Sequence, residues 1–185
     1  MNAPIKLGGA LAGVERQQHL TFALGGEMFA IGILSVKEII EYGSLTAVPM
    51  MPDCIKGVIN LRGAVVPVVD LARRFASRAT AITRRSCIVI IETANESAAG
   101  DGPQDVGVIV DAVSEVLEIH DDQIEPPPSF GTRIRTDFIA GMGKLDGRFV
   151  IILNVDKVLS MDELAMLAAA PADGNEPPGT LAAAA

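Results

Sequence analysis

An internal repeat of about 80 residues is the feature that most limits what this 185-residue chain can fold into. Residues 30–41 (AIGILSVKEIIE) match residues 107–118 (GVIVDAVSEVLE), and a second block matches later in each half. The unit is too long for a solenoid repeat and has the size of a small β-barrel. We therefore expect two similar barrels packed together, the first over about residues 19–80 and the second over about residues 85–159.

The local pattern agrees with an all-β fold. Short apolar runs rich in Val and Ile, each bounded by Gly, Pro, Asn or Asp, predict strands over residues 29–33, 64–69, 88–91, 106–110 and 149–153. The alternation breaks after Ile33 and after Val110, where spacings of three and four residues predict one tight helical turn or bend in each half. Pro67 inside a strand predicts an edge strand or a bulge, because proline cannot donate to the ladder.

Helical signals are few. Asp70 is placed to cap a short helix over residues 71–75. Ser160 and Glu163 form a capping box, which predicts a C-terminal helix over residues 161–168.

Both ends of the chain have the composition of flexible tails. Residues 1–18 and 169–185 are rich in small residues, which bury too little surface to offset chain entropy. One domain is therefore expected over residues 19–167. Within it, the small polar segment 92–105 predicts a mobile hairpin tip.

Composition and charge argue against several classes of function. The chain has 23 acidic and 15 basic residues and a net charge of −8, which disfavours binding to nucleic acid or to anionic membranes. The apolar runs are shorter than the roughly 20 residues of a membrane-spanning helix, so no membrane insertion is expected. Cys54 and Cys87 are isolated, which is typical of reduced thiols in the cytoplasm. These features predict a soluble cytoplasmic protein.

The sequence shows no catalytic constellation, and we expect no cofactor and no metal ion. The two histidines, His19 and His120, have no further ligands at a usable spacing. The arginine-rich stretch 73–85 fits a solvated connection between barrels, with a docking site for an acidic partner as the alternative. A chain with a good core and no catalytic apparatus is expected to act through its surfaces rather than as an enzyme.

Two charged positions interrupt the apolar pattern. Glu38 lies inside the apolar stretch FAIGILSVKEII, and Arg62 lies in the turn sequence Asn-Leu-Arg-Gly before the strand over residues 64–69. Gly63 can supply a positive φ in that turn. Polar groups beside an apolar strand edge are suited to recognition of a partner.

These segments resemble the CheW family of bacterial chemotaxis coupling proteins. The resemblance is carried by LTFALGGEMFAIGILSVKEI, by the block P-x-x-P-x-x-I-K-G-V-I-N-L-R-G-x-V-V-P-V-V-D-L from Pro49 to Leu71, and by VGVIVDAVSEVL, QIEPPPSF and FIAGMGKLDGRFVIILNVDKVL. Together they cover nearly all of residues 19–167. The fold that this resemblance implies is two five-stranded barrels of the Src-homology-3-like type, with a hydrophobic groove between them.

The resemblance also implies a function. Proteins of this family are non-catalytic adaptors that bridge the cytoplasmic tip of methyl-accepting chemoreceptors to the regulatory domain of the CheA histidine kinase, at membrane-associated receptor arrays. Carried over by position, the receptor-facing residues are Val36, Glu38, Ile39, Gly57, Arg62, Cys87 and Ile88. The kinase-facing residues are Tyr42, Leu45 and Phe130.

Two other functions remain open at this point. One is an adaptor of the same family in a non-flagellar chemosensory pathway, and the other is a small β-barrel enzyme or ligand-binding protein with a polar cluster in its groove. We also expect Glu38 and Arg62 to form an ion pair across the groove wall. Because an exposed pair contributes only ~0–1 kcal/mol to folding, its importance would be to orient the two side chains.

Overall fold

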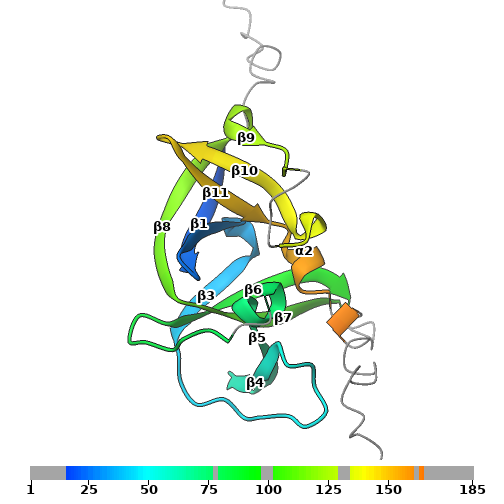
Figure 1. Cartoon of the computed structure of the whole chain (residues 1–185). Helices are drawn as coiled ribbons and strands as arrows, with labels where there is room; N and C mark the ends of the chain where they lie inside the picture. The colour runs from blue at the N-terminus through cyan, green and yellow to red at the C-terminus, as the bar shows by residue number, and fades with distance from the viewer. Residues whose placement is uncertain (1–15, 77–78, 97–101, 129–133, 161–162, 165–185) are drawn as a thin grey trace, which may run out of the picture.

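The computed structural model describes residues 16–76, 79–96, 102–128, 134–160 and 163–164, which form two β-sheets and a few short helical segments (Figure 1). One sheet has the strand order β8 (Ala112–His120), β1 (Arg16–Leu24), β2 (Glu27–Gly32), β11 (Arg148–Leu153), β10 (Ile139–Leu145) and β9 (Ile124–Glu125). The other has the order β3 (Val36–Glu41), β6 (Cys87–Glu96), β7 (Pro103–Val110), β5 (Ala64–Asp70) and β4 (Ile55–Leu61). The helical segments are η1 (Ile33–Ser35), α1 (Leu71–Ala76), η2 (Asp121–Gln123), η3 (Thr136–Phe138) and α2 (Val155–Val158).

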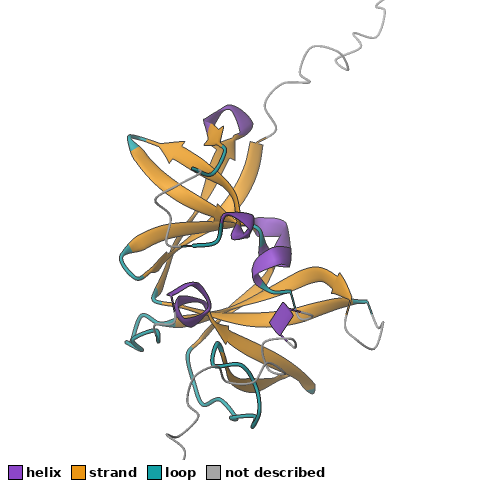
Figure 2. Ribbon diagram, turned by 45° about the vertical axis from the view of Figure 1, so that its right-hand side comes forward, coloured by secondary structure: helices purple, strands orange, loops and turns teal. Residues whose placement is uncertain are grey.

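Each sheet curls into a small barrel, and the two barrels are stacked with α2 beside their junction (Figure 2). We call the barrel that contains β1 the upper barrel and the barrel that contains β3 the lower barrel, as they lie in Figure 1. The prediction of an all-β, two-barrel fold is confirmed.

The boundaries predicted for the two barrels are wrong, because neither barrel is built from one half of the sequence. The upper barrel joins β1 and β2 from the first half to β8–β11, and the lower barrel places β6 and β7 from the second half between β3 and β5. The chain changes barrel at η1 and again at Asp111, the two places where the sequence breaks its alternation. The predicted turn or bend is present in both halves, as the helical turn η1 after β2 and as a single bend at Asp111 after β7.

The internal repeat survives this exchange of strands. In both barrels a strand of one half pairs in parallel with a strand of the other, β11 with β2 and β5 with β7. Both also shift register at a glycine, Gly57 in β4 and Gly141 in β10, which occupy matching positions of the repeat. The two barrels therefore share one strand order, completed each time by the other half of the chain.

The main core lies between the barrels. Phe22 and Phe29 stack with ring centroids 5.9 Å apart, and Phe75 of α1 continues the stack 5.7 Å from Phe29. Leu71 and Ile91 are buried in the same cluster. Each buried side chain of this size stabilises the fold by roughly 1.5–3 kcal/mol, so the junction binds the barrels into one unit.

Strand β5 corrects the interpretation of Pro67. It is an interior strand, paired with β4 on one side and with β7 on the other. Pro67 is tolerated because the parallel ladder to β7 begins only at Val68, opposite Gly107. Asp70 then caps α1 as predicted, since its Oδ1 accepts hydrogen bonds from the backbone N–H groups of Ala72 and Arg73.

The remaining sequence predictions lie at the margins. Residues 1–15 and 165–185 are outside the described residues, as are the hairpin tip at 97–101 and most of the predicted C-terminal helix. Of that helix the structure describes residues 163–164. The Glu163 N–H donates to Ser160 Oγ at 3.4 Å, and the side chain of Leu164 is buried.

Candidate functional site

Strand β3 is an edge strand of the lower barrel. Val36 pairs with Ile91 and Ile39 pairs with Val89, whose side chains lie in the core between the barrels. Val36 packs against that core, and Ile39 leaves 42% of its surface exposed. The edge of β3 therefore offers apolar surface next to the junction of the two barrels.

The repeat places a matching edge on the upper barrel. Strand β8 is the edge there, and its Val113 also packs against the core between the barrels. Val116 occupies the repeat position of Ile39 and is 47% exposed. Both edge strands thus border the junction with a half-exposed branched aliphatic side chain.

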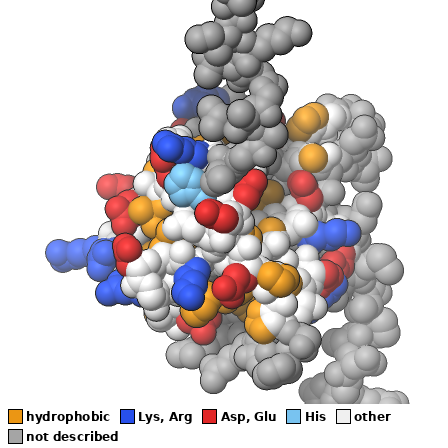
Figure 3. Space-filling model, turned by 90° about the horizontal axis from the view of Figure 1, so that it is seen from above, with side chains coloured by type: hydrophobic (Ala, Val, Ile, Leu, Met, Phe, Trp, Pro, Cys, Tyr) orange, Lys and Arg blue, Asp and Glu red, His pale blue; other side chains and the backbone are white. Residues whose placement is uncertain are grey.

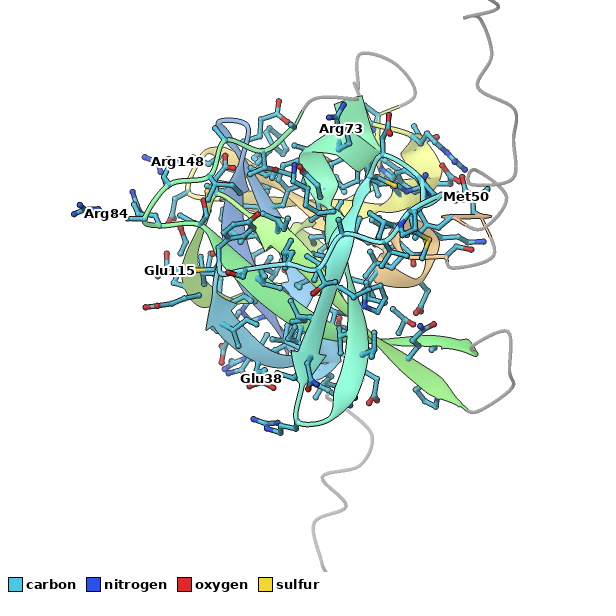
Figure 4. The ribbon with its side chains drawn as sticks, turned by 90° about the horizontal axis from the view of Figure 1, so that it is seen from below. Glu38, Met50, Arg73, Arg84, Glu115 and Arg148 are labelled. Atoms are coloured by element: carbon cyan, nitrogen blue, oxygen red, sulfur yellow. The ribbon has the colours of Figure 1, made fainter. Side chains whose placement is uncertain are left out.

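An ion pair joins β3, at its third residue, to the turn of the β4–β5 hairpin. The Arg62 guanidinium (Nη2) lies 3.1 Å from Glu38 Oε2 and donates a hydrogen bond to it. The Glu38 side chain is 25% exposed, and the Arg62 side chain is 79% exposed. Figure 4 shows Glu38 beside the turn of the β4–β5 hairpin, which carries Arg62. The pair predicted from the sequence is therefore present.

The turn that carries Arg62 has unusual backbone geometry. Arg62 has φ +53° and Gly63 has φ +87°, as a two-residue type I′ turn requires at both central positions. The Gly63 N–H donates to Asn60 Oδ1 at 2.9 Å, which stabilises the turn. Glycine, asparagine and aspartate are the residues that usually occupy the first position, so arginine is an unfavourable choice for the backbone.

A pocket of about 310 Å³ lies beside the ion pair. It opens because the β4–β5 hairpin separates from β7 before Pro67, where the parallel ladder has not yet begun. Its wall includes Lys37, whose Nζ lies 2.8 Å from both Glu92 Oε2 and Asp105 Oδ1. Hydrogen bonds to these two carboxylates hold the pKa of Lys37 above its usual range, so the lysine stays charged. Charged side chains therefore line this pocket, which lies beside the apolar edge of β3.

Comparisons with known proteins show the family to which the chain belongs. A family model described as "CheW-like domain" matches residues 18–163. The chain belongs to the CheW family. The Chemotaxis protein CheW of Klebsiella aerogenes is 36% identical over 162 residues, covering 88% of this chain and 91% of the relative. The CheW of Bacillus subtilis is 32% identical over 163 residues, covering 88% and 94%.

A solved structure shows the same fold. The scaffolding protein TtCheW from Thermoanaerobacter tengcongensis is 34% identical, with a TM-score of 0.69 over 81% of this chain and 92% of that chain. Scaffold and adaptor proteins of chemotaxis are therefore the class to which this chain belongs, and its CheW-like domain spans both barrels.

Most of the residues that the sequence predicts to face a receptor gather on one surface. Val36, Glu38, Ile39, Arg62 and Cys87 lie at the β3 edge and the adjoining turn, and each is partly or largely accessible. We call these five residues the β3-edge surface. Lys37 lies in the same region, and the sequence analysis did not single it out, since one lysine on an edge strand carries no distinctive signal.

Two of the predicted receptor residues, Ile88 and Gly57, are buried and do not lie on that surface. Ile88 is 1% exposed because strand alternation points it, with Ile90, into the lower barrel, whereas its neighbour Cys87 faces the junction. Gly57 is buried beneath the segment that follows β3. A Cβ at Gly57 would lie 2.5 Å from the Thr46 carbonyl oxygen, so this glycine permits close backbone packing.

Of the three predicted kinase-facing residues, the structure describes Tyr42 and Leu45. Tyr42 and Leu45 are half-buried over the interior of the lower barrel. Their segment is fixed by a two-way backbone bridge between Thr46 and Val58, with N···O distances of 2.9 and 2.8 Å. Phe130 lies outside the described residues. The segment that contains Tyr42 and Leu45 is thus held against β4 by the Thr46–Val58 bridge and by the close approach of the Thr46 backbone to Gly57.

The described part of the chain contains neither a helix long and apolar enough to cross a membrane nor a cluster of three or more His, Cys, Asp and Glu side chains placed to hold a metal ion. Seen from above, acidic and basic side chains are interspersed with hydrophobic ones (Figure 3). A hydrophobic signal that the sequence did not single out is Leu34 in η1, which is 99% exposed immediately before β3.

Proposed function

We propose that this chain is a non-catalytic adaptor that couples methyl-accepting chemoreceptors to the CheA histidine kinase. Its membership of a family of chemotaxis scaffolds supports this role. On this proposal it works in the cytoplasm and is recruited to membrane-associated receptor arrays by its partners.

The observation that carries the proposal is the Glu38–Arg62 ion pair beside the apolar residues of the β3 edge. A helical hairpin of a receptor would lay apolar side chains against Val36 and Ile39, in the helix-in-groove mode of recognition. The charged pair would fix its register, because charges at the rim of an interface contribute specificity more than affinity. Cys87, opposite Glu41 at the far end of β3, would mark the other limit of the contact.

An adaptor needs a second surface that stays free when the first is occupied. Tyr42 and Leu45 meet this need, since they lie beyond the end of β3 on the interior side of the lower barrel. We assign the kinase contact to this segment and to Phe130. The receptor contact and the Tyr42–Leu45 part of the kinase contact would then share the lower barrel without overlapping.

The experiment is a three-way co-elution of the chain, a receptor cytoplasmic fragment and the CheA regulatory domain. Arg62→Glu should remove the receptor fragment and leave the kinase domain bound, because the reversed charge faces Glu38. Arg84→Glu is the matched control, since Arg84 projects away from the barrels on an exposed loop (Figure 4). A folded Arg62→Glu variant that still carries both partners would contradict the proposal, as would a wild-type chain that binds neither.

A second candidate is an adaptor of another chemosensory pathway. The observation that favours it is a relative named Protein FrzA from Myxococcus xanthus, 29% identical over 145 residues and covering 77% of this chain and 85% of the relative. The same co-elution, repeated with every receptor and kinase of the source genome, separates the two candidates by the partners retained.

A further inference from the structure

A cavity of about 860 Å³ opens on the upper barrel, between β8, the start of β2 and the β10–β11 hairpin. Its lining includes the apolar side chains of Met28, Leu117, Met142, Leu145 and Phe149. Phe149 is 51% exposed, which is high for a phenylalanine. None of the described residues assigned above to the receptor or the kinase lines this cavity, so the inference does not depend on the proposed function.

The internal repeat relates this cavity to the ion-pair site of the lower barrel. Glu115 occupies the repeat position of Glu38, and the turn Asp146-Gly147 occupies that of Arg62-Gly63. The turns have the same backbone form, since Asp146 and Gly147 have φ +46° and +77°. The two sites therefore present the same acidic strand position opposite the same kind of turn.

The chemistry at the two sites differs in one respect. In the lower barrel the turn supplies a cation, Arg62, to the carboxylate of Glu38. In the upper barrel the turn supplies a second carboxylate, Asp146, and Glu27 adds a third acid to the lining. Among the described residues, no ion pair involves Glu115 or Asp146.

The acids outnumber the bases around this cavity. Arg148 is its one basic lining residue within the described chain. Figure 4 shows Arg148 and Glu115 on the same side of the molecule, both directed outward. Three carboxylates against one guanidinium leave the rim negative. Such a rim repels nucleic acid and anionic ligands.

We propose that this cavity binds a segment of a partner protein that presents one arginine or lysine between large apolar residues. The partner would supply in trans the cation that Arg62 supplies within the chain to Glu38. The cationic head would lie between Glu115 and Asp146, and the ring of Phe149 would add a cation–π contact. Met28 and Met142 suit the apolar residues, because methionine side chains adapt to irregular shapes.

The test is a titration of the ¹⁵N-labelled full chain, followed by its amide NMR spectrum. The probe is a capped peptide with a single arginine flanked on each side by two leucines. Its twin carries citrulline, a neutral isostere, in place of the arginine. Asp146→Arg places an arginine in the turn opposite Glu115, as Arg62 is placed opposite Glu38 in the lower barrel. The backbone should accept it, because the equivalent turn already contains an arginine. Glu115→Gln removes the acid without touching the turn, and Glu118→Arg is the control on the same strand outside the cavity.

The arginine peptide should shift amides of β8 and of the β10–β11 hairpin, and the citrulline peptide should bind about fivefold more weakly, near the upper limit for a partly exposed ion pair. Asp146→Arg and Glu115→Gln should weaken the arginine peptide to a similar extent, and Glu118→Arg should not. The proposal is overturned if the two peptides bind equally, if both cavity variants bind like the wild type, or if the shifts lie elsewhere or are absent.

Discussion

At Arg62 the backbone and the side chain have opposite requirements. A residue with a Cβ at φ +53° is strained by roughly 1 kcal/mol relative to glycine, and asparagine tolerates this geometry better. The side chain is mostly exposed and adds little packing. What the arginine gains in the structure is the contact with Glu38, which on the proposed function orients both side chains for a receptor.

This conflict gives a prediction that separates binding from stability. Arg62→Asn should leave the free energy of unfolding unchanged or raise it by up to about 1 kcal/mol, because asparagine relieves the strained turn. The same variant should weaken receptor binding, which calorimetry with a receptor fragment would measure. The control is Asp146→Asn, the same residue in the equivalent turn, which should bind the receptor as the wild type does. A receptor affinity unaffected by Arg62→Asn would contradict the account.

Gly57 has a role of a different kind. Gly57→Ala should destabilise the fold by roughly 1–3 kcal/mol, because the new methyl group meets the Thr46 carbonyl oxygen at 2.5 Å. It should also weaken kinase binding, since the Tyr42–Leu45 segment must move away from β4. Chemical denaturation and a pull-down with the kinase domain would measure the two effects. Gly43→Ala, where a Cβ meets nothing within 4 Å, should cause neither, and equal effects of the two substitutions would remove the packing argument.

At the end of β5, one buried carboxylate accepts several hydrogen bonds. Asp70 is 1% exposed, and besides capping α1 it accepts from the Thr80 backbone N–H at 3.0 Å and from Thr80 Oγ1 at 2.5 Å. Asp70 thus ties β5 and α1 to the loop that leads to β6. Its removal would leave buried donors without partners.

Asp70→Ala should therefore lower the free energy of unfolding by roughly 2–4 kcal/mol, from the lost cap and the unsatisfied groups of Thr80. Denaturant titration would measure it. Asp111→Ala is the matched control, because Asp111 Oδ2 accepts from Gly25 N–H at an exposed site and its loss should cost well under half as much. Similar losses for the two variants would show that burial of the Asp70 network contributes nothing.

For single elements, the sequence predicts the position along the chain better than it predicts which elements pair with one another. Strand ranges were predicted from local patterns for β2, β5, β6, β7 and β11, as were the capped helix α1 and a turn at Arg62, whereas the other six strands were given no range. The interpretation of Pro67 as an edge or bulge residue left out a third case, since one strand can pair on its two sides over different residues: Pro67 pairs with Val58 on one side and precedes the ladder to β7 on the other. Ile88 was assigned to the receptor surface from the family resemblance alone, and its side chain lies inside the lower barrel because alternation in β6 turns it away from the junction.

For the whole molecule, the repeat predicts two equivalent barrels but not which strands complete each one. Every exchanged strand has an equivalent in the other half, so the same apolar faces are buried whether the halves fold separately or exchange. The choice depends on where the chain leaves η1 and Asp111, and short connections of this kind have no distinctive sequence. Assignment of the β3-edge surface was possible only through the family resemblance.

The exchange predicts that neither half of the chain folds alone. Fragments 1–84 and 85–185, produced separately, should lack a cooperative thermal transition, because each would leave two incomplete sheets with open edges. Mixed at equal concentrations they should recover β-sheet circular dichroism and a cooperative melt. A cooperative transition in either fragment by itself would contradict the exchanged arrangement.

The central claim is that this chain places CheA under receptor control. The most direct measurement is CheA autophosphorylation in a reconstitution of receptor cytoplasmic fragments, CheA and this chain, with and without Arg62→Asn. We predict that receptors alter the kinase rate only when the wild-type chain is present, and that the variant binds CheA but loses this control. The claim is contradicted if receptors control the kinase equally well without the chain, or if the wild-type chain binds both partners and leaves the rate unchanged.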